Sequence, residues 1–260
     1  MNIKHLATAA LRRSLPRRAR QSLVNLGFNL DGERFQHLAS KYLFAPDMRF
    51  GLESLARRGF NPPIILDIGA FEGSWSKMAM EIWPEAKFLL VEANPAKAAL
   101  LRDDPRLKNA EVIESLLGPI DVPEVVFHVM ESGSSVFEEH SGVNRQPIML
   151  RQRTLDSLTR DLDSVDFIKI DVQGYELEVL KGGQQTLAKA QAILIELSLI
   201  EINQGAPLLA EALSFMNSAG FVAYDILEFH RRPLDGAMNQ IDVLFVREDS
   251  PLRADKRHWA

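Results

Sequence analysis

Two glycines and an acid lie where an apolar run meets a helical pattern. The run "IILDI" (64–68) contains Asp67, and Gly69 and Gly73 follow it. Glycine lets a backbone turn sharply and approach a ligand closely, and the helix that follows offers unpaired N–H groups. A plain strand-to-helix turn also uses glycine, for geometry alone. This pattern alone therefore indicates either a ligand loop or a simple turn.

A second acid favours the ligand loop. Glu92 ends the run "KFLLVE" (87–92), about 20 residues beyond the glycines, where a carboxylate accepts hydrogen bonds from ribose hydroxyls. The spacing G-x-x-x-G departs from the dinucleotide pattern G-x-G-x-x-G. Asp67 would also repel a pyrophosphate, whereas it suits an ammonium group. A nucleoside with a cationic, amino-acid-like tail is S-adenosylmethionine, which we predict ahead of NAD.

Further polar side chains occur at later strand-like runs. Lys169 and Asp171 lie two apart in "DFIKID" (166–171), so they point to one face of a strand. Glu196 lies near the end of the next strand-like run, "AILIEL" (192–197). Asp171 is a candidate base or orienting group for an acceptor; it could instead cap a turn or contact only the cofactor. Lys169 could offset charge near the acceptor or simply pair with Asp171. Asp171 and Glu196 together could hold Mg²⁺, which prefers oxygen ligands. Two carboxylates are a small ligand set for a metal ion, so we predict no metal.

Two histidines are further candidates, since histidine is the usual base near neutral pH. His140 lies in "EEHSG", a loop that could cover the acceptor, and His230 follows a strand-like run in "EFHRRP". The alternative for each is an ordinary solvated side chain.

Alternating strand and helix patterns must position these residues. Several strand-like runs are apolar almost throughout, as in a parallel sheet covered on both faces, and amphipathic helical patterns separate them. Asn94 is expected to cap one helix, and Pro84 to end another. The alternation predicts a doubly wound α/β sheet. The runs 124–130 and 148–152 have no helix between them and are predicted to form an antiparallel insertion.

Four stretches together resemble FkbM-type methyltransferases, a branch of the class I S-adenosylmethionine-dependent enzymes. They are "DIGAFEG" (67–73), "VEANP" (91–95), "SGSSVF" (132–137) and the block 154–197 around "DFIKIDVQGYELEVLKG". The similarity runs from about residue 60 to about residue 248. It implies a mostly parallel, seven-stranded Rossmann-like sheet of order 3-2-1-4-5-7-6. It also implies methyl transfer to oxygen, often of a sugar or polyketide hydroxyl.

The resemblance also assigns residues to the site. The cofactor-binding set is Asp67, Gly69, Ala70, Phe71, Gly73, Glu92, Ala93, Ser115, Leu116 and Asp171. Asp171 and Glu196 should face the reacting methyl group, and with Lys169, His140 and His230 they form the candidate catalytic set. Two positions depart from the family pattern: Phe71 replaces a common asparagine, and Gln173 stands where many relatives have glutamate.

Composition limits the setting and the partners. The chain of 260 residues has 46% apolar and 25% charged residues and no cysteine, so a globular protein without disulfides or thiolate metal sites is expected. Its net charge of −5 gives no reason to expect a nucleic-acid partner. No apolar run approaches the roughly 18 residues of a membrane span, and the apolar stretch after His5 is too short for an export signal. We predict a cytoplasmic protein.

Three segments are expected: a basic helical extension (1–59), a class I methyltransferase domain (60–250) and a tail (251–260). Residues 1–30 carry six Lys or Arg and no acid, with Pro16 and Gly27 expected to interrupt the helical pattern. The extension could be a helical cap over the sheet, a peripheral contact with an anionic membrane surface, or a docking segment for an acidic partner or a second copy of the chain.

The predicted function is S-adenosylmethionine-dependent O-methylation of a hydroxyl on a sugar, glycan or secondary metabolite. The alternatives are a catalytically silent Rossmann-like scaffold subunit and a nucleotide-dependent oxidoreductase, which the glycine spacing disfavours. The acceptor itself cannot be named, because acceptor specificity resides in loops that vary independently of the fold.

Overall fold

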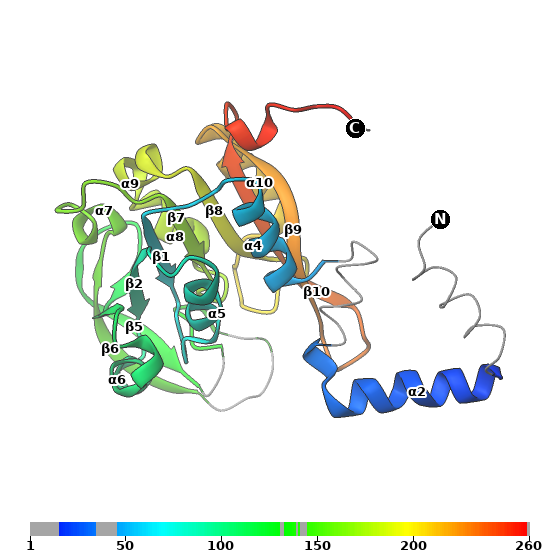
Figure 1. Ribbon diagram of the computed structural model, residues 1–260. Helices are drawn as coiled ribbons and strands as arrows, with labels where there is room; N and C mark the ends of the chain where they lie inside the picture. Colours follow the sequence, from blue (N-terminus) through cyan, green and yellow to red (C-terminus); the bar gives the residue numbers. More distant parts are fainter. Residues whose placement is uncertain (1–15, 35–45, 131–132, 139, 141–144, 259–260) are drawn as a thin grey trace. The chain divides into compact units, whose positions relative to one another are not determined.

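The computed structural model describes residues 16–34, 46–130, 133–138, 140 and 145–258. The chain divides into two compact units, Met1–Phe50 and Gly51–Ala260. Figure 1 traces the second unit around one central sheet.

The central sheet confirms the predicted class I methyltransferase fold. Its seven strands lie in the order β3-β2-β1-β7-β8-β10-β9, which is 3-2-1-4-5-7-6 once the insertion strands are set aside. All neighbours are parallel except β10, which runs antiparallel to β8 and β9. The strands are β1 (Ile64–Ile68), β2 (Lys87–Glu92), β3 (Glu111–Glu114), β7 (Phe167–Ile170), β8 (Ala192–Ser198), β9 (Phe221–Arg231) and β10 (Met238–Arg247).

Helices follow the strands as the amphipathic patterns predict. Asn94 caps its helix as expected, because its side-chain oxygen accepts a hydrogen bond from the Ala96 N–H. The helix that begins at Ser74 ends before Pro84. The helices described from residue 46 onward are α4 (Met48–Arg57), α5 (Ser74–Ile82), α6 (Pro95–Asp103), α7 (Leu155–Leu158), α8 (Glu176–Lys181), α9 (Gln184–Lys189) and α10 (Leu209–Ser218), with 3₁₀ turns at Pro105–Leu107 and Pro251–Arg253.

The core lies along the central strands. Strands β7 and β8 are buried over nearly their whole length, which explains why their sequences lack the alternation of a half-exposed strand. Phe167 of β7 also makes edge-to-face contacts with Phe60 and Trp83. The parallel strands of this core all end at one edge of the sheet, and open α/β sheets bind their ligands at that edge.

The predicted insertion forms a separate three-stranded sheet. Strands β5 (Val122–Val129) and β6 (Gln146–Arg153) pair antiparallel, as expected. A third strand, β4 (Leu116–Leu117), joins β6 in parallel. A strand of two residues is too short to show a period of two, so the sequence did not reveal it.

The first unit contains helix α2 (Arg17–Leu30). Pro16 precedes it, but the expectation that Gly27 interrupts the helix is wrong, because Gly27 lies inside α2; a glycine costs a helix only about 1 kcal/mol relative to alanine. Leu23, Leu26 and Leu30 of α2 are exposed. Residues 1–15 and 35–45 of the expected extension lie outside the described residues. No helix in the described ranges is long and apolar enough to span a bilayer.

Candidate active site

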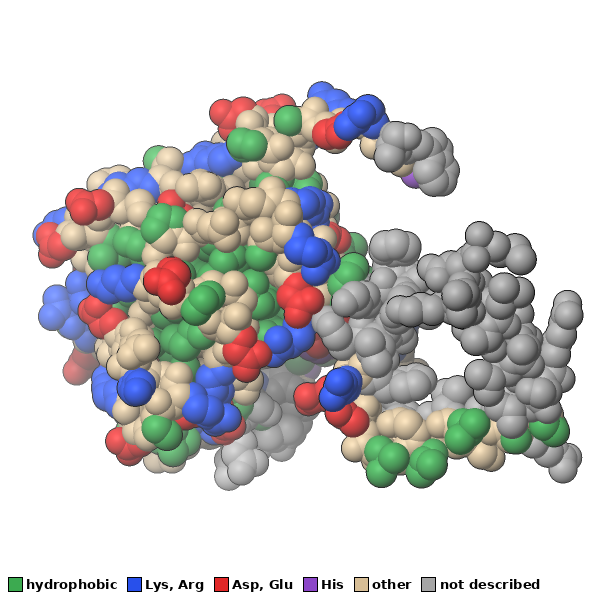
Figure 2. All heavy atoms as spheres, viewed as in Figure 1, with side chains coloured by type: hydrophobic (Ala, Val, Ile, Leu, Met, Phe, Trp, Pro, Cys, Tyr) green, Lys and Arg blue, Asp and Glu red, His purple; other side chains and the backbone are tan. Residues whose placement is uncertain are grey.

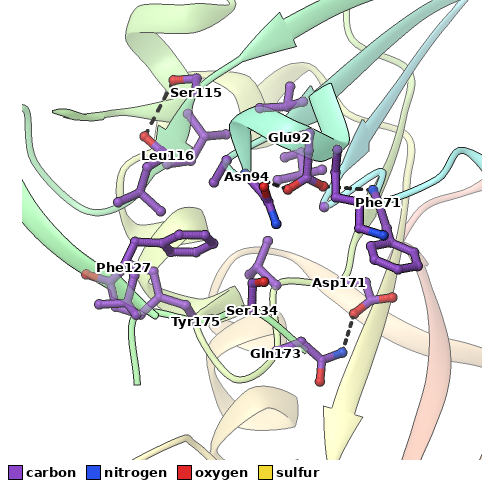
Figure 3. Close-up of a pocket in the computed structure, with 18 of the residues that line it drawn as sticks. Phe71, Glu92, Asn94, Ser115, Leu116, Phe127, Ser134, Asp171, Gln173 and Tyr175 are labelled. Atoms are coloured by element: carbon purple, nitrogen blue, oxygen red, sulfur yellow. Dashed lines mark hydrogen bonds between the residues drawn. The ribbon is translucent and has the colours of Figure 1, made fainter. Parts of the chain in front are cut away.

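A cavity opens at the carboxyl ends of β1, β2 and β7 (Figure 3). It comprises about 860 Å³ of space between atoms, part of it open to solvent. Its walls come from the loops after these strands, the insertion sheet and the segment 133–136. The lining residues are Ile68, Gly69, Phe71, Val91, Glu92, Ala93, Asn94, Lys97, Ser115, Leu116, Leu117, Phe127, Gly133, Ser134, Val136, Asp171, Val172, Gln173 and Tyr175.

The glycines of the β1–α5 loop allow close packing of the backbone. Gly69 has φ +78°, and a Cβ there would lie 1.8 Å from the Asp171 carbonyl oxygen. A Cβ on Gly73 would lie 2.6 Å from the Leu107 side chain. Gly69 lines the cavity, whereas Gly73 and Ala70 do not. The loop therefore needs glycine to approach Asp171 after β7 and the 3₁₀ turn at Pro105–Leu107, and Gly69 additionally leaves room at the cavity wall.

Glu92 is held at the edge of the cavity by two backbone hydrogen bonds. The Phe71 N–H donates to its Oε2 and the Asn94 N–H to its Oε1, each at 2.8 Å. The carboxylate is 7% exposed, and burial raises its pKa while these two bonds lower it. Each oxygen keeps a lone pair, and Figure 3 shows the group among the cavity residues. Glu92 is thus a fixed acceptor for two further hydrogen bonds.

One part of the cavity forms an apolar slot. Leu116 and Leu117 of β4 and Phe127 of β5 line it, and Tyr175 of the β7–α8 turn lies next to Phe127 (Figure 3). Ser115 lies beside them, so the predicted pair Ser115 and Leu116 does line the cavity. A flat heterocyclic base fits such a slot, because aromatic and aliphatic side chains cover its faces.

Asp67 lies beneath the loop and outside the cavity. It is fully buried, and the Ser76 hydroxyl donates to its Oδ2 at 2.6 Å. The Lys169 ammonium lies 3.6 Å from Asp67 Oδ1 and 3.1 Å from Asp171 Oδ2. Burial raises the pKa of Asp67, and Lys169 opposes that rise. The predicted cofactor acid is therefore placed to hold Lys169.

Asp67, Lys169 and Asp171 form an ion-pair triad. Asp171 is the member of the triad that reaches the cavity (Figure 3). Burial works against its ionisation, but the Lys169 ammonium and a hydrogen bond from Gln173 outweigh burial and lower its pKa. Burial also works against the charge of Lys169, whose pKa the two carboxylates nevertheless raise. The triad thus presents an ionised carboxylate to the cavity at neutral pH.

Gln173 connects Asp171 to Glu196. Its Nε2 donates to Asp171 Oδ1 at 2.8 Å and to Glu196 Oε2 at 2.9 Å. Its backbone carbonyl accepts from Ser135 Oγ at 2.9 Å and from Asn203 Nδ2 at 2.8 Å. One amide group therefore bridges the two carboxyl groups.

The two positions that depart from the family pattern share a backbone conformation. Phe71 has φ +52° and Gln173 has φ +54°, the only two described non-glycine residues with positive φ. Such residues are uncommon and cost free energy, and they cluster at functional sites. The Glu92 bond to the Phe71 N–H and the two bonds to the Gln173 carbonyl hold these conformations.

The other catalytic candidates lie apart from the cavity lining. His230 belongs to β9, which extends four residues beyond the predicted run, so the expectation that it follows the strand is wrong. Its Nε2 lies 3.3 Å from Asp242 Oδ2 and 3.9 Å from Glu196 Oε1. The contact with Asp242 raises the pKa of His230, and burial, with the nearby acids, raises that of Glu196. His140 is exposed, and its backbone N–H donates to the Ile202 carbonyl.

Several residues of the site were not foreseen. Phe127, Tyr175 and Lys97 line the cavity, and Gln240 donates to Glu196 Oε2 at 2.7 Å. Asp242 is 4% exposed. Among these residues, only Asp242 could have been noticed in the sequence, because it is an acid inside the otherwise apolar run "IDVLFV".

Glu176 provides a pH-dependent element next to the site. Its Oε1 accepts from the Val172 and Gly174 N–H groups at 3.0 Å, and burial raises its pKa to about 7. The folded state thus keeps a proton that the unfolded chain releases near pH 4.3. The contribution of Glu176 to the free energy of unfolding should therefore fall as pH rises from about 4 to about 7, by up to about 1.4 kcal/mol per pH unit. Above about pH 7 this contribution should stay level.

We therefore expect Glu176→Gln to flatten this dependence. The amide oxygen can still accept both bonds but does not titrate, so between pH 5 and pH 8 the variant should gain about 2–3 kcal/mol over the wild type. Urea unfolding at both pH values measures this difference. Glu178→Gln, in the same helix but paired with Lys181 at the surface, is the control. Parallel pH profiles for wild type and Glu176→Gln would contradict the assignment.

Comparisons with known proteins identify the family of the chain. Residues 67–223, more than half of the chain, match the family model described as the methyltransferase FkbM domain. The 2-O-methyltransferase NoeI of Sinorhizobium fredii (strain NBRC 101917 / NGR234) is 32% identical over 184 residues, which cover 62% of this chain and 74% of that protein.

Solved structures are more distant in sequence. The precorrin-6y C5,15-methyltransferase of Geobacter metallireducens GS-15 is 15% identical, with a TM-score of 0.46 over 76% of this chain and 86% of that one. The fibrillarin pre-rRNA processing protein of Methanococcus jannaschii is 14% identical, with a TM-score of 0.45 over 72% and 66%.

Proposed function

The chain belongs to the FkbM methyltransferase family, and from this premise we propose that it transfers a methyl group from S-adenosylmethionine to a hydroxyl of a sugar or glycan. The observation that carries the proposal is the cavity, in which fixed Glu92 and ionised Asp171 line the same space. The name of the relative NoeI, a 2-O-methyltransferase, supports oxygen as the atom methylated.

The residues present fit the adenosine part of the cofactor. Glu92 would accept hydrogen bonds from the two ribose hydroxyls, since both its oxygens are held and each keeps a free lone pair. The slot of Leu116, Phe127 and Tyr175 would hold the adenine. Gly69 would lie along the remaining tail, where a larger side chain would intrude on Asp171.

The chain's own residues would position the acceptor and receive its proton. When bound, S-adenosylmethionine supplies a methyl group on a sulfonium. Asp171 keeps one lone pair on each oxygen after its bonds to Lys169 and Gln173, so it can accept a hydrogen bond from the acceptor hydroxyl. The hydroxyl becomes strongly acidic only as its oxygen bonds to carbon. A carboxylate with a lowered pKa therefore suffices as the base.

We expect Glu92→Gln to weaken binding of S-adenosylhomocysteine by about 10–100-fold, because hydrogen bonds to a charged group contribute about 1.5–3 kcal/mol. Calorimetric titration measures the change. The control is Glu114→Gln, since Glu114 lies opposite Glu92 on β3 but pairs with Arg102 at the surface. A Glu92→Gln protein that melts like the wild type and binds with equal affinity would contradict this role.

The acceptor class is tested by methyl transfer itself. The protein is incubated with methyl-labelled S-adenosylmethionine and a panel of pyranosides, oligosaccharides and nucleotide sugars, each paired with its 2-deoxy analogue. Label should appear in a saccharide, and its loss with the 2-deoxy analogue would place the methyl group at the 2-hydroxyl. Label transfer to none of the saccharides, by a protein that binds the cofactor, would remove sugars as the acceptor class.

Surface charge supports a small acceptor over nucleic acid. On the face of Gly51–Ala260 seen in Figure 2, basic and acidic side chains are interspersed, and the whole chain carries −5. A nucleic-acid-binding face usually shows a basic patch or stripe. The interpretations of the basic N-terminal segment stay predictions.

A further inference from the structure

Two buried acids face each other across adjacent strands behind the cavity. Glu196 of β8 and Asp242 of β10 are direct partners in the antiparallel pairing, and they are 8% and 4% exposed. Like charges directly opposite each other destabilise a sheet, and unpaired buried charges are costlier still. This position therefore calls for a cation or for protons.

His230 of β9 completes the group. Its Nε2 lies 3.3 Å from Asp242 Oδ2 and 3.9 Å from Glu196 Oε1. One nitrogen carries at most one hydrogen, so it cannot donate to both acids, and 3.9 Å is too long for a hydrogen bond. One carboxylate oxygen from each acid and one imidazole nitrogen all lie within 4.8 Å of one another.

These separations resemble those between ligands of one metal ion. Zinc–nitrogen and zinc–oxygen bonds of about 2.0–2.2 Å place tetrahedral ligand atoms roughly 3.3–3.5 Å apart. The His230–Asp242 distance already matches, and the His230–Glu196 distance requires a small inward movement. Gln240 and Gln173 both donate to Glu196 Oε2, and Oε1 is the atom that lies nearer His230. Such outer hydrogen bonds commonly orient metal ligands.

We infer that Glu196, His230 and Asp242 form a binding site for one divalent transition-metal ion. Two carboxylates with one imidazole suit Zn²⁺ or Mn²⁺ better than Mg²⁺, which prefers oxygen ligands alone. The His230 side chain is 42% exposed, which provides an entry path. Three protein ligands leave coordination positions open.

The position of the site suggests its use. Gln173 donates from one nitrogen to both Glu196 and Asp171, so the site adjoins the end of the cavity where Asp171 lies. An open coordination position there could hold an oxygen of the acceptor. The inference rests on the three ligands and stands independently of the proposed reaction.

The test is calorimetric titration of the full chain, without an affinity tag and freed of metal by chelation, with ZnCl₂, MnCl₂ and MgCl₂. We expect one site for Zn²⁺ or Mn²⁺ and weaker binding of Mg²⁺. His230→Gln and Asp242→Asn should each weaken binding by about 100-fold or more, since losing an outer-shell partner alone costs 10–100-fold. His128→Gln, in the insertion, should bind as the wild type does.

Two outcomes would overturn the site: no binding of Zn²⁺ or Mn²⁺ at millimolar concentration, or binding that His230→Gln and Asp242→Asn leave unchanged. The first would mean that His230 alone serves as the counter-cation. If a variant fails to fold, Co²⁺ in the wild type still decides, because Co²⁺ held by protein ligands in a four- or five-coordinate site should give intense visible absorption bands that added Zn²⁺ abolishes. S-adenosylhomocysteine titrated into the same samples reports on the proposed function separately.

Discussion

Asp171→Asn should lower kcat/KM for methyl transfer by at least about 100-fold, the size expected for loss of a positioned base, while S-adenosylhomocysteine binds within about threefold of the wild type. The asparagine keeps the shape of the side chain and an oxygen that can accept from Lys169 or Gln173. It cannot take a proton from the acceptor. Labelled methyl transfer to the best saccharide of the panel measures the rate.

The same experiment separates the roles that the sequence left open for Asp171. A large loss of rate with intact cofactor binding assigns it to the acceptor. An equal loss of both would instead place it in cofactor binding and contradict our assignment. Asp163→Asn, an exposed acid before β7, controls for general effects of charge.

Lys169→Met should destabilise the fold by about 3–5 kcal/mol, the usual cost of removing one partner from a buried ion pair. Lys169 is 5% exposed and lies between Asp67 and Asp171. Without the ammonium, the buried Asp67 and the partly exposed Asp171 lose their common counter-ion. Urea unfolding gives the change in free energy, and Lys181→Met, which breaks a surface pair with Glu178, should cost less than about 1 kcal/mol.

A double variant sharpens this prediction. Asp67→Asn in the Lys169→Met background removes one of the unpaired charges, and the Ser76 hydroxyl can still donate to the asparagine oxygen in place of Asp67 Oδ2. Part of the lost stability should return. If Lys169→Met unfolds at the same urea concentration as the wild type, the triad is not the structural element that we describe.

The order of the sheet could be predicted because each strand carries its own local signal and the family resemblance supplies the topology. The apolar run at β1 and the Asn94 cap of α6 are examples. The prediction that Gly27 interrupts the helix was wrong because the low helix propensity of a single glycine is outweighed by the other residues of the helix. The two-residue strand β4 had no local signal, since only its pairing with β6 defines it.

The placement of candidate residues was predictable for those at strand ends, and less so where it depends on the register between strands. Glu92, Asp171 and Ser115 line the cavity as expected. That Asp67 would hold Lys169 depends on the register between β1 and β7, in which the two residues are partners. Asp242 meets Glu196 only through the antiparallel pairing of β8 and β10.

The central claim is that the cavity binds S-adenosylmethionine, and the most direct test is calorimetric titration of the intact protein with S-adenosylhomocysteine, with NAD as the control ligand. We predict binding of S-adenosylhomocysteine at one site and no heat from NAD. Binding of neither ligand would favour a silent scaffold that keeps the fold, and binding of NAD alone would contradict our account of the Gly69 loop and of Glu92.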